Sequence, residues 1–174
     1  MSGALIVTAE LEAADFAWLD AERRAHFPPE RNQLAAHLTM FHALLPSAEE
    51  EVRGQLKMLA QASPPQATLI GLINLGGGVA YRVHSDGLAE IRAQIADHFV
   101  GSLTAQDGQG WRPHVTIQNK VQPAQAKALF YQLSRDFRPR PLTIHGLALH
   151  RYLGGPWEAL GRYPFRRGRQ SHRS

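Results

Sequence analysis

The chain has 174 residues, of which 44% are hydrophobic and 20% charged, an ordinary composition for a globular domain. No apolar run approaches the roughly 20 residues needed to cross a bilayer, and the first residues lack the layout of a secretory signal. The absence of cysteine excludes disulfides and thiolate metal sites. We therefore expect one cytoplasmic domain over residues 1–165, monomeric and without membrane contact.

The positive net charge of +4 comes from the C-terminal end of the chain. The last nine residues contain no acid and hold four arginines: Arg166, Arg167, Arg169 and Arg173. Without these four, 15 of the 19 basic residues remain and balance 15 acidic ones. The pattern predicts a disordered basic tail over residues 166–174, which either contacts a phosphate backbone or merely keeps the protein soluble.

The first third of the chain predicts a strand, a helix and a second strand. Residues 3–10 are rich in Leu, Ile and Val, which favours a strand. Residues 13–25 have apolar side chains at helical spacing, and Pro28 and Pro29 stop the helix. After a loop, residues 35–43 predict the second strand.

This second strand alternates polar and apolar residues, which indicates one buried face. His37 and Thr39 therefore lie on the same face, about 7 Å apart, with aliphatic neighbours in the core. By the same period Phe41 shares the face of His37, where it could stack on a base. His42 falls on the opposite face and is expected to have no role in a site.

The middle of the chain predicts two helices around a hairpin. A capping box formed by Ser47 and Glu50 starts a helix that runs to about residue 62. Three consecutive glycines join strands over 68–75 and 79–84, as in a β-hairpin. Residues 87–100 form the next helix.

The motif of the second strand recurs 77 residues later in the chain. After a polar, glycine-rich loop at 101–112, the predicted strand 113–119 carries His114 and Thr116, again separated and followed by aliphatic residues. If the two strands lie side by side, the two imidazoles and two hydroxyls form one polar site.

The remaining elements are a helix over 123–135, a long strand over 141–153 and a last strand over 157–165. Each half of the chain thus contains a His-Thr strand, a helix and a hairpin with a glycine turn. This order predicts an α+β fold derived from a duplication with pseudo-twofold symmetry.

The segments AHLTMFH and RPHVTIQN resemble the paired His-x-Thr motifs of the 2H phosphoesterase superfamily, and within it the 2′-5′ RNA ligase-like group. One such motif is common by chance, but two in matching aliphatic context are specific. The resemblance covers most of the chain. It implies a bilobal fold, in which two mostly antiparallel sheets with flanking helices surround a central cleft in pseudo-twofold arrangement.

The resemblance also implies a function and its residues. We expect hydrolysis of 2′,3′-cyclic phosphate ends of RNA or nucleotides to 2′-phosphates, without metal or other cofactor. His37 and His114 carry over as acid and base, and Thr39 and Thr116 as groups that hold the phosphate. By the resemblance His114 activates water and His37 protonates O2′. These residue types suit the chemistry, because histidine titrates near neutrality and a fixed hydroxyl can donate to the phosphate oxygens.

Three further residues are expected to bind substrate: Phe41, Arg112 and Trp157. Arg112 precedes the second motif closely enough to reach a phosphate, and Trp157 is the nearest match to a tyrosine that many members have near the last strand. Two other functions stay open, reversible 2′-5′ RNA ligation and noncatalytic binding of RNA ends. Two intact His-Thr pairs argue against a mere binder, which would not require two titrating groups.

Overall fold

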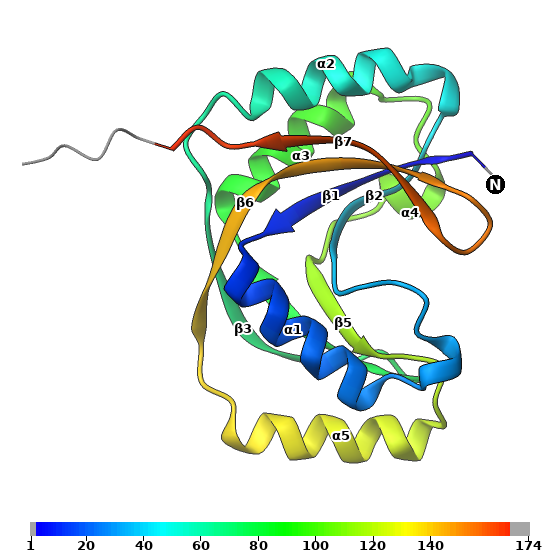
Figure 1. Cartoon of the computed structure of the whole chain (residues 1–174), viewed down its shortest axis with the longest axis vertical. Coiled ribbons are helices and arrows are strands. Elements are labelled where there is room, and N and C mark those ends of the chain that lie inside the picture. The colour runs from blue at the N-terminus through cyan, green and yellow to red at the C-terminus, as the bar shows by residue number, and fades with distance from the viewer. Residues whose placement is uncertain (1–2, 168–174) are drawn as a thin grey trace, which may run out of the picture.

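The structure is a computed structural model that describes residues 3–167 (Figure 1). Within these residues, seven strands form one antiparallel sheet, and five α-helices pack around it. The α+β class predicted from the sequence is confirmed.

The strands run in the order β2-β1-β6-β3-β4-β5, and β7 pairs with β6. Their bounds are β1 Leu5–Leu11, β2 Leu38–Leu44, β3 Gln66–Asn74, β4 Val79–His84, β5 His114–Gln118, β6 Arg140–Tyr152 and β7 Trp157–Pro164. One edge of β6 pairs with β1, while its other edge pairs first with β3 and then with β7. Strand β6 is 13 residues long, so it can pair with β3 near its start and with β1 and β7 further on. It thereby joins the two expected sheets into one. The pseudo-twofold arrangement of two lobes stays a prediction.

The helices cover separate parts of the sheet. Their bounds are α1 Ala13–His26, α2 Glu49–Leu59, α3 Asp86–His98, α4 Ala105–Gly108 and α5 Pro123–Asp136, with short 3-10 helices at Pro29–Arg31 and Pro46–Ala48. Helix α1 contacts β5, α2 contacts β6 and β7, and α5 contacts β3 and β4. Helix α4 contacts β2, so that each of the two motif strands has a helix beside it.

Most predicted elements agree with the structure to within a few residues, but two local predictions are wrong. The capping box does not form, because Ser47 lies inside the 3-10 helix and α2 begins at Glu49 without a side-chain cap. The expected loop at 101–112 contains α4, whose N-terminus is capped by the Thr104 hydroxyl, which accepts from the Asp107 N–H.

The sheet brings the two motif strands together. Strands β2 and β5 are the two ends of the strand path, and they contact each other in the middle of the molecule (Figure 1). The aliphatic residues of both motifs are completely buried: Leu38, Met40, Val115 and Ile117 each have 0% exposure. The core therefore holds the opposite faces of the two strands, and the histidines and threonines are left to face outward.

The C-terminal end is described only in part. Residues 168–174 of the predicted tail lie outside the described residues, while Arg167 donates a hydrogen bond to Glu12 at 2.6 Å. No helix within residues 3–167 has the length and apolar character to cross a membrane.

Candidate active site

The two His-Thr pairs line a single cleft of about 690 Å³, called the His-Thr cleft below. Thr39 lies at the start of β2 and His37 directly precedes this strand, while His114 and Thr116 come from β5. The convergence that the sequence predicts is therefore present in the structure, although the two pairs lie far apart along the chain.

Both histidines are held in the same way by the backbone. Nδ1 of His37 lies 2.8 Å from the carbonyl oxygen of Ala35, and Nδ1 of His114 lies 2.8 Å from that of Arg112. A carbonyl only accepts hydrogen bonds, so Nδ1 must carry a proton in each ring. In the neutral form of either ring, Nε2 then holds the lone pair and is the atom that can accept a proton.

His37 lies against two other rings. Its imidazole is 4.7 Å from the Trp157 ring, which in turn is 5.3 Å from the ring of His150. Burial lowers the pKa of His37 to about 4; the hydrogen bond to Ala35 opposes this, and Arg23 and His150 lower the pKa further. His37 is therefore neutral at pH 7 in the free protein.

An irregularity in β2 changes which residues face the cleft. Thr39 pairs with Thr8, but Phe41 pairs with Val7, so β2 has one extra residue between these positions. Such a bulge reverses the side-chain alternation beyond it. Phe41 is consequently 0% exposed in the core, which corrects the expectation that it stacks on a base. His42, expected on the opposite face, lines the cleft instead.

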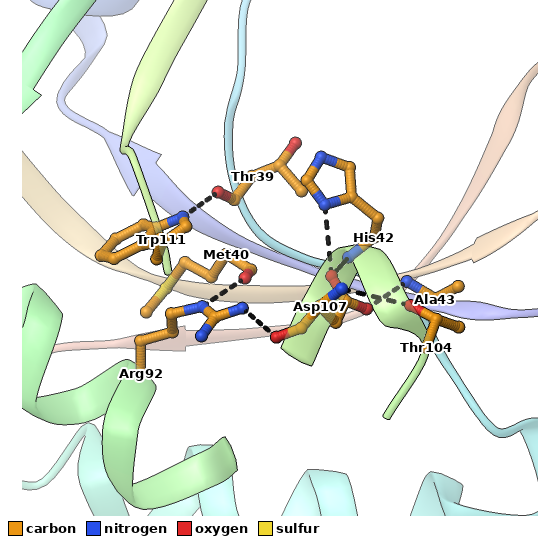
Figure 2. A network of polar contacts seen from close by, with 8 residues as sticks. All are labelled: Thr39, Met40, His42, Ala43, Arg92, Thr104, Asp107 and Trp111. Atoms are coloured by element: carbon orange, nitrogen blue, oxygen red, sulfur yellow. Dashed lines mark hydrogen bonds and ion pairs between the residues drawn. The ribbon is translucent and has the colours of Figure 1, made fainter. Parts of the chain in front are cut away.

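A buried carboxylate fixes His42 (Figure 2). Asp107 on α4 is 1% exposed; its Oδ1 accepts from the backbone N–H of His42 at 2.8 Å and lies 3.2 Å from the His42 ring. Its Oδ2 accepts from the N–H of Ala43 at 2.9 Å. Burial by itself would raise the pKa of Asp107, but the hydrogen bonds from His42 and Ala43 outweigh it and lower the pKa. The carboxylate stays ionised and ties α4 to β2.

Side chains from outside the strand also hold the backbone of the first motif (Figure 2). The Trp111 indole N–H donates to the carbonyl of Thr39 at 3.1 Å. Arg92 of α3 is 8% exposed and donates to the carbonyl of Met40 at 3.1 Å, while its guanidinium lies 4.5 Å from the Phe41 ring centre.

The second motif has an equivalent support from the other half of the chain. Arg23 of α1 is 5% exposed and donates to the carbonyl of Thr116 at 3.0 Å. Its guanidinium lies 4.3 Å from the Phe27 ring centre. In both motifs a buried arginine on a helix thus fixes the strand that carries the histidine. Sequence reasoning missed Arg23 and Arg92, since on a helix both have the pattern of ordinary surface charges.

The other expected substrate-binding residues lie at the cleft. Arg112 and Trp157 both line it. Within residues 3–167, no three side chains of His, Cys, Asp or Glu form a group that could hold a metal ion.

Comparison with known proteins establishes the family. A family model described as the 2′-5′ RNA ligase superfamily matches residues 10–156, and the chain belongs to this superfamily. The resemblance to 2H phosphoesterases noted in the sequence is therefore confirmed. No curated protein matches the chain.

Three solved structures with the same fold have low sequence identity to the chain. TT0787 of Thermus thermophilus is 15% identical with a TM-score of 0.66, over 94% of this chain and 98% of that one. E. coli LigT complexed with 3′-AMP is 19% identical with a TM-score of 0.61, over 96% and 100%. LigT complexed with NADP+ is 18% identical with a TM-score of 0.56, over 95% and 99%. At these identities the likeness establishes the fold.

Proposed function

We propose that the protein hydrolyses 2′,3′-cyclic phosphate ends of RNA or nucleotides to 2′-phosphates. The observation that carries this proposal is the pair of imidazoles in one cleft, each with Nδ1 bound to a backbone carbonyl and Nε2 left for proton transfer. Arg112 at the same cleft supplies a positive charge for the phosphate. The nucleotide complexes of LigT, with 3′-AMP and with NADP+, support a nucleotide as the ligand.

The protonation state of His37 suggests how the two histidines divide the work. Since its pKa is lowered to about 4, neutral His37 accepts a proton from the attacking water at pH 7. His114 then donates a proton to the leaving oxygen. This assignment reverses the roles expected from the resemblance.

The product fixes which bond breaks. A 2′-phosphate keeps the P–O2′ bond, so the bond that breaks is P–O3′ and the proton goes to O3′. The expectation that O2′ is protonated would give a 3′-phosphate and is corrected here. Thr39 and Thr116 lie beside the imidazoles along the cleft, where their hydroxyls can donate to the non-bridging oxygens as charge develops.

Replacement of either histidine tests the proposal. We expect His37→Asn and His114→Asn each to lower kcat for adenosine 2′,3′-cyclic phosphate by roughly 10²–10⁴-fold, the usual contribution of a general acid or base. The assay is run in EDTA, with 2′-AMP and 3′-AMP separated by chromatography. His98→Asn, at the end of α3 and away from the cleft, is the matched control and should keep wild-type turnover. Near-wild-type activity in either cleft variant, or 3′-AMP as the product, contradicts the proposal.

A second candidate function, reversible 2′-5′ ligation, is favoured by a specific observation. A further cavity adjoins the His-Thr cleft on the other side of His37 and Trp157. Ligation needs room for two nucleosides, one on each side of the phosphate.

A further inference from the structure

His42 lines the His-Thr cleft but takes no part in the proton transfers proposed above. Its side chain is 42% exposed, and Asp107 is the only group among residues 3–167 that bonds to its ring. Because an ionised carboxylate only accepts hydrogen bonds, the Nδ1 atom that lies against Asp107 carries a proton. Nε2 of His42 is therefore left for a ligand of the cleft.

The irregular pairing of β2 places His42 in a row with the first motif. Because β2 has one extra residue between Thr39 and Phe41, the three steps from Thr39 to His42 cover about two ordinary strand positions. His42 then lies about 7 Å beyond Thr39, just as His37 lies about 7 Å before it. In Figure 2 the Thr39 hydroxyl and the far nitrogen of the His42 ring point to the same side. A hydroxyl thus lies between two imidazoles along one edge of the cleft.

One buried carboxylate holds both the backbone and the ring of His42. Strand β2 is irregular again between Phe41 and Leu44. There Asp107 accepts from the N–H groups of His42 at 2.8 Å and Ala43 at 2.9 Å, and its Oδ1 also lies 3.2 Å from the His42 ring. Since the ring is already fixed, a ligand that contacts Nε2 pays little for ordering this side chain.

The charges of the cleft favour an anion beside His42. Among the described residues that line the cleft with it, no carboxylate is present, and the charged or titratable side chains are all basic: His37, Arg92, Arg112 and His114. The carboxylate of Asp107 is 1% exposed and is not part of the lining. With a phosphate in the cleft, a protonated His42 ring lies between two negative groups that both attract it.

We propose that His42 is a third phosphate-binding residue of the cleft, whose protonated Nε2 donates to a non-bridging oxygen beside the Thr39 hydroxyl, with Asp107 as its counter-charge. The inference rests on the proposed function of the cleft and adds a residue to its binding machinery. His37 and His114 keep the proton transfers. Since hydrolysis turns a cyclic monoanion into a monoester of higher charge, His42 binds the product more tightly than the substrate.

Two replacements of similar shape separate the atoms of the ring. In His42→Asn the amide can still donate to Asp107, but no atom remains at the position of Nε2. In His42→Gln the longer side chain brings a neutral N–H donor to that position. His84→Asn is the matched control, because His84 is also exposed beside an aspartate, Asp86, and does not line the cleft.

Binding of 2′-AMP, measured by titration calorimetry, tests the contact directly. We expect His42→Asn to weaken it by roughly 10–100-fold, the contribution of a hydrogen bond to a charged group, and His42→Gln to weaken it less. The kcat/KM for adenosine 2′,3′-cyclic phosphate should fall by roughly 10-fold in His42→Asn, less than in the His37 and His114 variants. His84→Asn should leave both quantities unchanged.

Equal affinity of the wild type and His42→Asn for 2′-AMP overturns the inference, and so does an equal loss of affinity in His84→Asn. Urea denaturation checks that the variants are folded. If His42→Asn is not, His42→Gln decides by the same comparison with the wild type.

Failure of the proposed function would give a different result. If the wild type binds 2′-AMP but does not turn over the cyclic phosphate, the proposed hydrolysis is wrong, and the affinities of the variants for 2′-AMP still decide on His42. If the wild type does not bind 2′-AMP at all, the inference is overturned.

Discussion

At the scale of single residues, the proposed role of His37 as the base predicts how activity depends on pH. Its pKa of about 4 means that the neutral form is present above pH 4 and is lost as the pH falls below this value. If His37 is the base, kcat/KM should hold down to about pH 4–5 instead of halving near the ordinary histidine pKa of about 6.5. If His37 were the acid, kcat/KM would fall as the pH rises above 4.

The cause of the low pKa can be tested separately. Since His37 is buried against Trp157, we expect Trp157→Ala to expose the imidazole and move its pKa toward about 6.5. The Cε1–H signal of His37, followed by NMR from pH 3 to about 8, measures this pKa directly. An unchanged titration midpoint in Trp157→Ala would show that burial against the indole is not the cause.

At the scale of the elements, the stability of β2 depends on Asp107. Replacement by Ala leaves the part-buried backbone N–H groups of His42 and Ala43 without their charged acceptor, at a cost of about 1–3 kcal/mol each. We expect Asp107→Ala to lower the free energy of unfolding by at least about 2 kcal/mol, measured by urea denaturation. Asp97→Ala, at an exposed position of α3, is the control and should change it by less than about 0.5 kcal/mol.

The elements also show what the sequence could and could not predict. Alternation placed His37, Thr39, His114 and Thr116 correctly, because the irregularity in each strand comes only after its threonine. The same rule failed two residues beyond Thr39, where the extra residue of β2 turns Phe41 into the core and His42 toward the cleft. A bulge depends on the pairing with β1, which the residues of β2 alone do not specify. Arg23 and Arg92 escaped prediction for a similar reason, since their acceptors are carbonyls of distant strands.

At the scale of the whole molecule, the position of β5 depends on the glycine turn between β3 and β4. A Cβ added to Gly78 would lie 1.9 Å from the carbonyl oxygen of Gln118, the last residue of β5. We expect Gly78→Ala to push β5 away and to lower the free energy of unfolding by about 1–3 kcal/mol or more. Turnover should fall as well, because β5 carries His114.

Gly71 of β3 provides the comparison for this prediction. A Cβ there would meet no atom within 4 Å, so Gly71→Ala should keep wild-type turnover and leave stability equal or raised by about 0.5–1 kcal/mol. Thermal and urea unfolding measure the stability of both variants, and the activity assay measures their turnover. Equal behaviour of the two variants would show that close contact at Gly78 does not position β5.

The long strand β6 has a consequence for how the protein is made. It joins the strands that carry the first motif to those that carry the second, yet it begins only at Arg140, after both motifs in the chain. During synthesis, both His-Thr motifs therefore leave the ribosome before β6 does. Until β6 has been made, the part of the sheet with the first motif and the part with the second are not joined. A translation product that stops before Arg140 would carry a complete set of motif residues and no assembled cleft.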